Sequence, residues 1–170
     1  MSKKTRAVQP DSSLRTAVDF AIEMEKMGAL FYKLLAAKFV HDEEIEEIFT
    51  ALADEEADHQ QQFESLLSSI RPNANNPKHS DKLAMQRDIA DLFIGNGALN
   101  GIHSREDALD RALQLEKQTL DHYLGMRNLL GENEVLTALI ETEKKHMRIL
   151  LECKITGKKQ EDRRRKPGRA

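Results

Sequence analysis

One pattern of residues occurs twice along this chain, and it constrains the fold more than any other feature of the sequence. Aligning Glu25 with Glu116 brings two segments into register, and aligning Glu56 with Glu143 does the same for two others. The matched pairs are Val18 with Leu109, Ile22 with Leu113, Ala29 with Leu120, Tyr32 with Tyr123, Phe49 with Leu136, Leu52 with Leu139, His59 with His146, and Phe63 with Leu150. The repeat predicts two similar halves, each made of two segments.

Within each segment the apolar residues recur at the spacing of an amphipathic helix. Only 8 Gly and 4 Pro occur among the 170 residues, so we predict an all-α chain. The predicted helices cover residues 14–40, 42–70, 81–94, 104–130 and 132–156. The connections within each half are short, whereas a long crossover with Pro72 and Pro77 separates the halves, which is the layout of a four-helix bundle. Ser104 followed by Asp107 resembles a capping box.

The charge of the chain is distributed unevenly. Residues 157–170 contain seven Lys or Arg and two acidic residues, and residues 1–10 add three basic residues. The net charge of −3 therefore conceals a net charge of −11 over residues 11–156. We predict a folded domain over residues 11–156 and a basic, disordered tail over residues 157–170. No apolar run is long enough to span a membrane and no hydrophobic signal segment follows Met1, which predicts a cytoplasmic protein without membrane contact.

Six polar residues lie on the apolar faces of the predicted helices. They are Glu25, Glu56, His59, Glu116, Glu143 and His146. Each histidine follows a glutamate by three residues, which places the two side chains on one helix face between apolar neighbours. The sequence therefore predicts that four carboxylates and two imidazoles converge on one core.

Four buried carboxylates would either take up protons or need matching positive charge, and two divalent metal ions supply that charge. Oxygen and imidazole ligands suit iron, manganese or zinc. One glutamate from each of two helices, with Glu-x-x-His from each of the other two, is the ligand set of ferritin-like di-iron and di-manganese proteins. The single Cys153 excludes an internal disulfide, a Cys-rich zinc site and a rubredoxin-type iron site. The alternative is a purely structural bundle, in which the glutamates flank the core and the histidines are ordinary core groups.

Four segments of the chain resemble the rubrerythrin branch of the ferritin-like superfamily, over about residues 14–155. They are Glu25-Lys-Met-Gly-Ala-Leu-Phe-Tyr32, Glu55-Glu56-Ala-Asp-His59, Glu116-Lys-Gln-Thr-Leu-Asp-His-Tyr123 and Glu143-Lys-Lys-His146. The resemblance implies a ferritin-like bundle that binds two iron ions. It implies that Glu56 and Glu143 bridge the two metals, and that His59 and His146 supply one nitrogen each. By the same resemblance, Glu25 and Glu116 each cap one metal.

The chain departs from rubrerythrins at two points. Thr119 stands where they carry an extra glutamate, one turn after the ligand of the third main helix, and one cysteine cannot build a rubredoxin module. These departures disfavour a self-contained peroxidase. The ligand set is also similar to that of bacterioferritins, but a basic tail stands where a cage subunit has its short fifth helix. It resembles membrane-associated quinone hydroxylases as well, although no strongly apolar helix face is present.

The resemblance implies a di-iron oxidoreductase that reduces hydrogen peroxide or O2, as a peroxidase or a ferroxidase. It also implies an external electron donor, such as a rubredoxin-like protein, and a homodimer. Substrate oxygenation stays open, because the shape of the pocket that selects a substrate does not follow from the sequence. The alternative is a non-catalytic iron-binding or stress-protection protein whose basic tail contacts nucleic acid.

The remaining aromatic, histidine and cysteine residues carry weaker signals. Tyr32 and Tyr123 each lie seven residues after a repeated glutamate, and the resemblance implies that they donate hydrogen bonds beside the ligands; ordinary core aromatics are the alternative. His122 precedes Tyr123 and could approach the site from an adjacent face, but a ligand must share the apolar seam, so we expect His122 to be structural or exposed. We expect Cys153 to be semi-buried and inert. Exposure is predicted for His41, His79 and His103.

Overall fold

The computed structural model describes residues 10–69, 79–95, 99–131 and 134–165. Its helices are α1 (Pro10–Lys38), α2 (Glu43–Ser69), α3 (His79–Ile94), α4 (Arg105–Leu130) and α5 (Glu134–Arg165). The described residues contain no strand, so the prediction of an all-α chain is confirmed. Each predicted helix has a counterpart among these five. Among the described helices, none is both long and apolar enough to cross a membrane.

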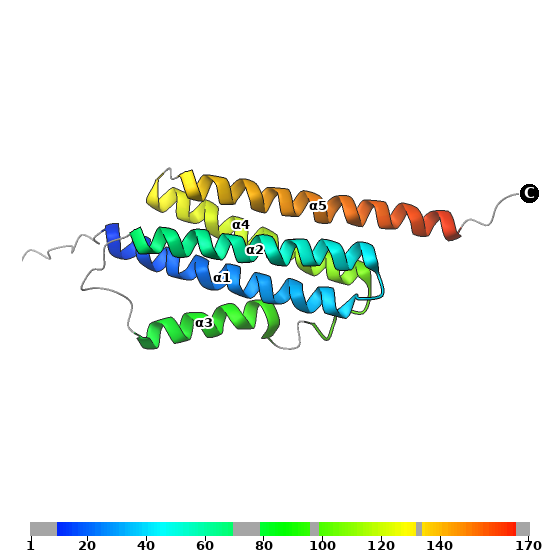
Figure 1. Cartoon of the computed structure of the whole chain (residues 1–170), viewed down its shortest axis with the longest axis horizontal. Coiled ribbons are helices and arrows are strands. Elements are labelled where there is room, and N and C mark those ends of the chain that lie inside the picture. Colours follow the sequence, from blue (N-terminus) through cyan, green and yellow to red (C-terminus); the bar gives the residue numbers. More distant parts are fainter. Residues whose placement is uncertain (1–9, 70–78, 96–98, 132–133, 166–170) are drawn as a thin grey trace, which may run out of the picture. The chain divides into compact units, whose positions relative to one another are not determined.

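The helices belong to two compact units. The first unit contains α1, α2 and α3, and the second contains α4, as far as Asn128, together with α5. Within the first unit α1 and α2 run antiparallel, and within the second unit α4 and α5 do the same (Figure 1). Antiparallel pairs of long helices are the elements from which a ferritin-like four-helix bundle is built.

The core of the first unit is rich in aromatic side chains. Tyr32 of α1 stacks on Phe49 of α2 with ring centroids 5.9 Å apart, and Phe39 meets Phe49 at 6.4 Å. Offset contacts of this kind stabilise a core beyond the area that they bury. The fully buried side chains of α1 and α2 include Val18, Phe31, Leu35, Ile45 and Phe63. The apolar stripes that predicted these two helices therefore meet in one core.

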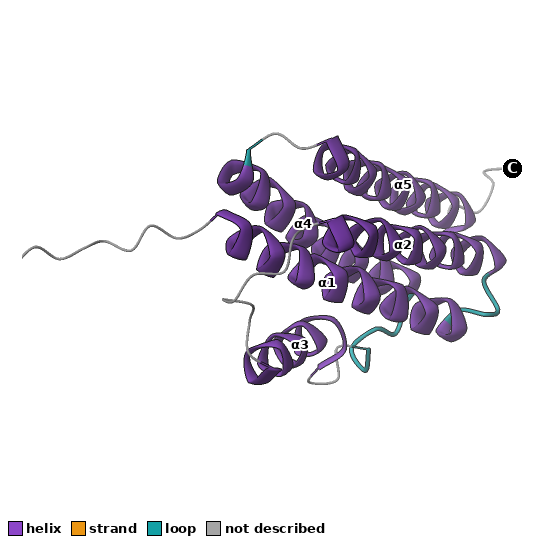
Figure 2. Ribbon diagram, turned by 60° about the vertical axis from the view of Figure 1, so that its left-hand side comes forward, coloured by secondary structure: helices purple, strands orange, loops and turns teal. Residues whose placement is uncertain are grey.

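Helix α3 lies beside α1 (Figure 2). Its Phe93 packs against Phe31 of α1 in an edge-to-face contact, with centroids 6.5 Å apart. Gln86 of α3 donates a hydrogen bond of 2.7 Å to Glu23 of α1. The contacts that hold the predicted crossover helix on the first unit thus include both an aromatic and a polar one.

Helix α4 begins with the predicted capping box. The amide of Asp107 donates to Oγ of Ser104 over 3.1 Å, and the amide of Ser104 donates to Oδ2 of Asp107 over 2.9 Å. These reciprocal bonds satisfy backbone donors that a helix start otherwise leaves without partners. The hydrogen bond with the Ser104 side chain is the main cause that holds the pKa of Asp107 below its ordinary value.

Polar contacts join α4 to α5 near the start of α4. Nη2 of Arg105 donates to Sγ of Cys153 over 3.0 Å, and Lys154 forms an ion pair with Asp110. Deeper in the second unit the fully buried side chains are mostly aliphatic. They include Leu109, Leu139, Ile140 and Leu150, with Tyr123 as the aromatic member.

Helix α5 continues past the predicted end at residue 156 and reaches Arg165. The expectation of disorder from residue 157 onward is therefore corrected for residues 157–165; residues 166–170 lie outside the described residues. Lys, Gln, Glu and Arg are good helix formers, and a helix that already exists extends without a new nucleation step. The high charge of this segment does not end the helix. The division into a domain over 11–156 and a tail stays a prediction.

Candidate metal centre

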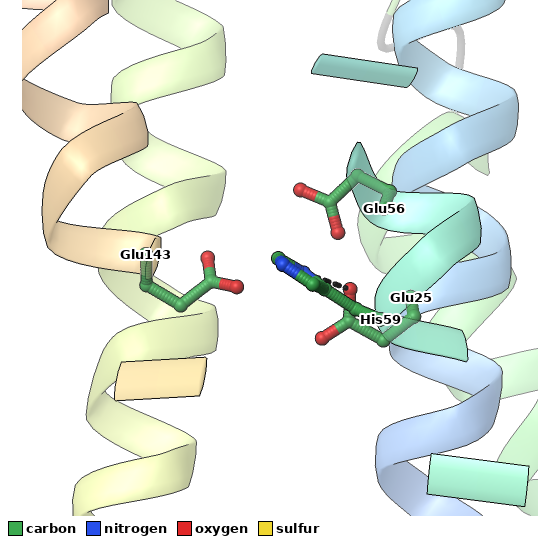
Figure 3. Close-up of side chains that lie close together, drawn as sticks. All are labelled: Glu25, Glu56, His59 and Glu143. Carbon is green, nitrogen blue, oxygen red and sulfur yellow. Dashed lines mark hydrogen bonds and ion pairs between the residues drawn. The ribbon is translucent and has the colours of Figure 1, made fainter. Parts of the chain in front are cut away.

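The first unit gathers three of the predicted ligands into one cluster, the first triad. Glu25 comes from α1, whereas Glu56 and His59 come from α2, one turn apart (Figure 3). One ligand atom of each residue lies within 4.8 Å of the others. Nδ1 of His59 and Oε2 of Glu25 are joined by a hydrogen bond of 3.2 Å. All three residues are at most 4% exposed.

The second unit gathers the corresponding residues into a second triad. Glu116 comes from α4, and Glu143 and His146 come from α5, with one ligand atom of each again within 4.8 Å of the others. Nδ1 of His146 lies 3.5 Å from Oε2 of Glu116 and 4.0 Å from Oε2 of Glu143. None of the three is more than 3% exposed.

Helical spacing explains why these polar side chains point inward. In α2 the Glu-x-x-His pair lies between Leu52 and Phe63, which are both buried. In α5 the same pair lies between Leu139 and Leu150, also buried. Burial of these flanking residues sets the rotation of each helix, and residues three and four positions away share the buried face. The apolar neighbours therefore carry the charged residues into the core.

Each triad contains two carboxylates and one imidazole in nearly dry surroundings. Removing a carboxylate from water is costly unless a positive charge or hydrogen bonds compensate it. A protonated histidine balances one carboxylate, whereas a divalent ion balances both and also uses the imidazole nitrogen as a ligand. The donor set fits iron, manganese or zinc, and each triad could hold one such ion.

Both predicted tyrosines lie in the cores of their own units. Tyr32 is 2% exposed and stacks on Phe49, and Tyr123 is fully buried with its ring 5.9 Å from that of His122. Both tyrosines are therefore aromatic residues of the core. Hydrogen bonding of their hydroxyls to the metal ligands stays a prediction.

Several other residues take the positions that the sequence indicated. His41 and His103 are exposed, and the side chain of His79 lies outside the described ones. His122 is half-buried, and this burial lowers its pKa. Cys153 is buried and accepts the hydrogen bond from Arg105.

Three buried features of α1 escaped the sequence analysis. Asp19 and Glu23 are both less than 10% exposed, and Glu23 is hydrogen-bonded to Gln86. Nothing in the sequence indicates this burial; for Glu23 it involves Gln86 of α3, a residue far away in the sequence. The third feature is Gly28, which lies against the carboxylate of Glu56. A glycine inside a predicted helix was a signal that could have drawn attention to it.

Comparison with known proteins yields one match. A family model described as Rubrerythrin matches residues 17–154. No curated protein and no solved structure matches. Because the matched region is most of the chain, the chain belongs to the rubrerythrin family, whose domain is a ferritin-like di-iron domain. The predicted family and the predicted ferritin-like fold class are both confirmed.

Proposed function

We propose that this member of the rubrerythrin family is a di-iron oxidoreductase that reduces hydrogen peroxide or O2. The observation that carries the proposal is the presence, in both units, of a buried triad with the same donor set. The family match supports it, because the matched domain is of the di-iron type. In this proposal each triad receives one iron ion, so that the chain binds two.

The proposed roles of the ligands follow their places in the repeat. Glu25 and Glu116 each bind one iron ion, and each histidine supplies one nitrogen. Glu56 and Glu143 would each hold iron as well, in the bridging role that the family resemblance implies. The four carboxylates then carry a charge of −4 against +4 on two ferrous ions, which supports a divalent pair over a single ion.

A bound ferrous pair supplies two electrons, the number that converts one hydrogen peroxide and two protons into two waters. The chain contributes the surroundings: burial of the triads strengthens the attraction between carboxylate and cation and keeps bulk water away. The hydrogen bond between His59 and Glu25 fixes the orientation of the imidazole. Tyr32 and Tyr123, each two helical turns after a capping glutamate, are proposed to donate hydrogen bonds to the ligands. An external donor such as a rubredoxin-like protein returns the electrons to a homodimer.

Metal loading tests the proposal directly. The purified chain, titrated anaerobically with Fe(II), should bind about two irons, counted by elemental analysis after removal of free metal. Addition of peroxide or O2 should then produce ferric absorption in the near-ultraviolet and visible range. Faster oxidation by peroxide indicates a peroxidase, and faster oxidation by O2 indicates a ferroxidase. A chain without stoichiometric metal under every loading condition contradicts the proposal and supports the purely structural bundle.

Ligand variants with matched controls assign the metal to the triads. Glu56→Ala and His146→Ala should each lower the bound iron to about one per chain or less, because each removes a donor that no solvent group replaces. Glu64→Ala and Glu152→Ala remove exposed carboxylates from the same helices, α2 and α5, and should retain two irons. Equal iron content in all four variants would mean that the triads are not the binding residues.

A second candidate function is favoured by the helical structure of part of the basic segment, residues 157–170. The segment is rich in Lys and Arg and α5 continues through it to Arg165, and basic residues suit contact with phosphates. In this alternative the chain binds iron without catalysis and contacts nucleic acid in a stress response. Deletion of residues 157–170 should then abolish binding to duplex DNA, and binding by the full chain should weaken steeply with added salt. Binding that survives the deletion excludes this role for the segment.

A further inference from the structure

Gly28 and Gly125, two of the glycines that lie inside long helices, have different surroundings. Gly28 is within α1, and Gly125 is within α4. A glycine in a helix interior destabilises the helix relative to alanine, because its backbone loses more freedom on folding. A Cβ added at Gly125 would meet nothing within 4 Å. The three heavy atoms nearest to a Cβ added at Gly28 all belong to the side chain of Glu56.

The contact at Gly28 is close and involves a metal-ligand candidate. The three atoms nearest to an added Cβ are Oε2, Cδ and Cγ of Glu56, at 3.1, 3.2 and 3.4 Å. These separations are shorter than the roughly 3.5–4.0 Å of a comfortable carbon contact. Glu56 is itself 4% exposed, so little free space surrounds it. The Glu56 carboxylate of the first triad therefore borders the place of an added Cβ so closely that it would have to shift by a few tenths of an ångström.

The second unit builds its triad with a side chain at the equivalent position. Gly28 follows Glu25 by three residues, and Thr119 follows Glu116 by three. Thr119 is 6% exposed, so its methyl and hydroxyl groups lie in the interior. The two triads share their donor types. One turn after Glu25, the first triad has a glycine without a side chain, whereas one turn after Glu116 the second triad has a threonine.

We propose that Gly28 is a positioning residue for Glu56, and that the missing side chain is what allows the Glu56 carboxylate to lie within the first triad. It follows that the metal affinity of the first triad depends on the space at residue 28, whereas the second triad does not share this dependence. The statement about affinity rests on the proposed metal function; the statement about position does not.

Thermal unfolding of the metal-free chain tests the position. Gly125→Ala should raise Tm by about 1–4 °C, as expected for alanine in place of glycine in an open helix position. Gly28→Ala should not raise Tm, because the new methyl group displaces Glu56. In a Glu56→Ala background the obstacle is gone, so adding Gly28→Ala should raise Tm as much as Gly125→Ala does. This double-mutant cycle isolates the coupling between residues 28 and 56.

Metal titration tests the consequence. Co²⁺, whose visible spectrum reports its ligands, is titrated into the full chain and its variants. Gly28→Ala should weaken one of two binding steps by about tenfold or more and change the spectrum of that step, while Gly125→Ala leaves both steps unchanged. Thr119→Ala alone should not weaken the binding step that Gly28→Ala weakens; the affinity of that step should equal its value in the unsubstituted chain.

The outcomes separate this inference from the proposed function. If Gly28→Ala raises Tm as Gly125→Ala does in both backgrounds, Gly28 does not position Glu56. If the cycle shows the coupling but both Co²⁺ steps are unaltered by Gly28→Ala, the dependence of affinity on residue 28 is overturned. If the cycle shows the coupling and the unsubstituted chain binds no metal, the proposed function fails while the positioning of Glu56 by Gly28 stands.

Discussion

The first and second units carry the same triad in different cores. Where the first unit has the buried aromatic residues Phe49 and Phe63, the second has the buried leucines of the repeat, Leu136 and Leu150. The ligand types are unchanged, although the packing residues around them differ in volume and shape. Apolar packing tolerates such exchanges when total volume is kept, whereas a metal ligand has no substitute of another type. The repeat thus separates residues selected for chemistry from residues selected for filling space.

A second difference concerns the helix that only the first unit has. Phe31 is fully buried because Phe93 of α3 packs against it. The described part of the second unit contains no helix corresponding to α3, and the residue equivalent to Phe31 there is His122, which is half-buried. A polar ring suits a position that keeps some contact with solvent. The additional helix therefore explains why one repeat position differs in polarity between the units.

The largest effect that can sharpen this comparison comes from truncating the cores. Phe49→Ala should lower the free energy of unfolding by about 4 kcal/mol, and Leu136→Ala by about 3 kcal/mol. The aromatic variant loses more because Phe49 contacts both Tyr32 and Phe39. Urea denaturation followed by circular dichroism measures both. Phe49→Leu, which makes the first unit resemble the second, is the control and should cost less than Phe49→Ala. Equal losses for the two alanine variants would mean that the aromatic contacts add nothing.

How far the sequence predicted the molecule depends on the range of the interactions involved. The spacing of apolar residues located the helices, and Ser104 with Asp107 located the start of α4, because both signals arise within a few residues. The triads were predictable because the repeat placed their residues on buried faces. The burial of Asp19 and Glu23 was not predictable; Glu23 meets Gln86 of α3, a contact between residues far apart in the sequence. The contact of Gly28 with Glu56 likewise depends on the distance between two helices, which no local pattern contains.

An exchange at the position of Phe31 and His122 should have the next largest effect. Phe31→His should lower stability by about 2–3 kcal/mol at pH 7.5, because it buries a polar ring in the contact with Phe93. The converse variant, His122→Phe, tests the acid range. Burial lowers the pKa of His122, so below pH 6.5 the unfolded chain binds a proton that the folded chain does not, and stability falls with decreasing pH.

The stability gained by His122→Phe should therefore increase as the pH falls from 7.5 to 5.5. Solvent screening at this half-buried ring keeps the increase below about 1 kcal/mol. The measurement is the difference in unfolding free energy between variant and parent at each pH, which removes the contribution of other titrating groups. A difference that is the same at both pH values contradicts the assigned effect of burial on His122.

The smallest effect distinguishes two of the helix starts, those of α4 and α2. Ser104→Ala should lower stability by about 1 kcal/mol, because the reciprocal bonds with Asp107 are short. Asp42→Ala should cost about half as much, because the bond that its carboxylate accepts from the amide of Ile45 is long, at 3.4 Å. The pKa of Asp107 is lowered in the folded chain, so its share of the capping box is present above pH 3.8 and disappears as the pH falls through the lower folded value. The loss caused by Ser104→Ala should accordingly shrink below pH 3.8, measured by urea denaturation along a pH series. If the loss were as large in acid as at neutral pH, the charge of Asp107 would have no part in holding the start of α4.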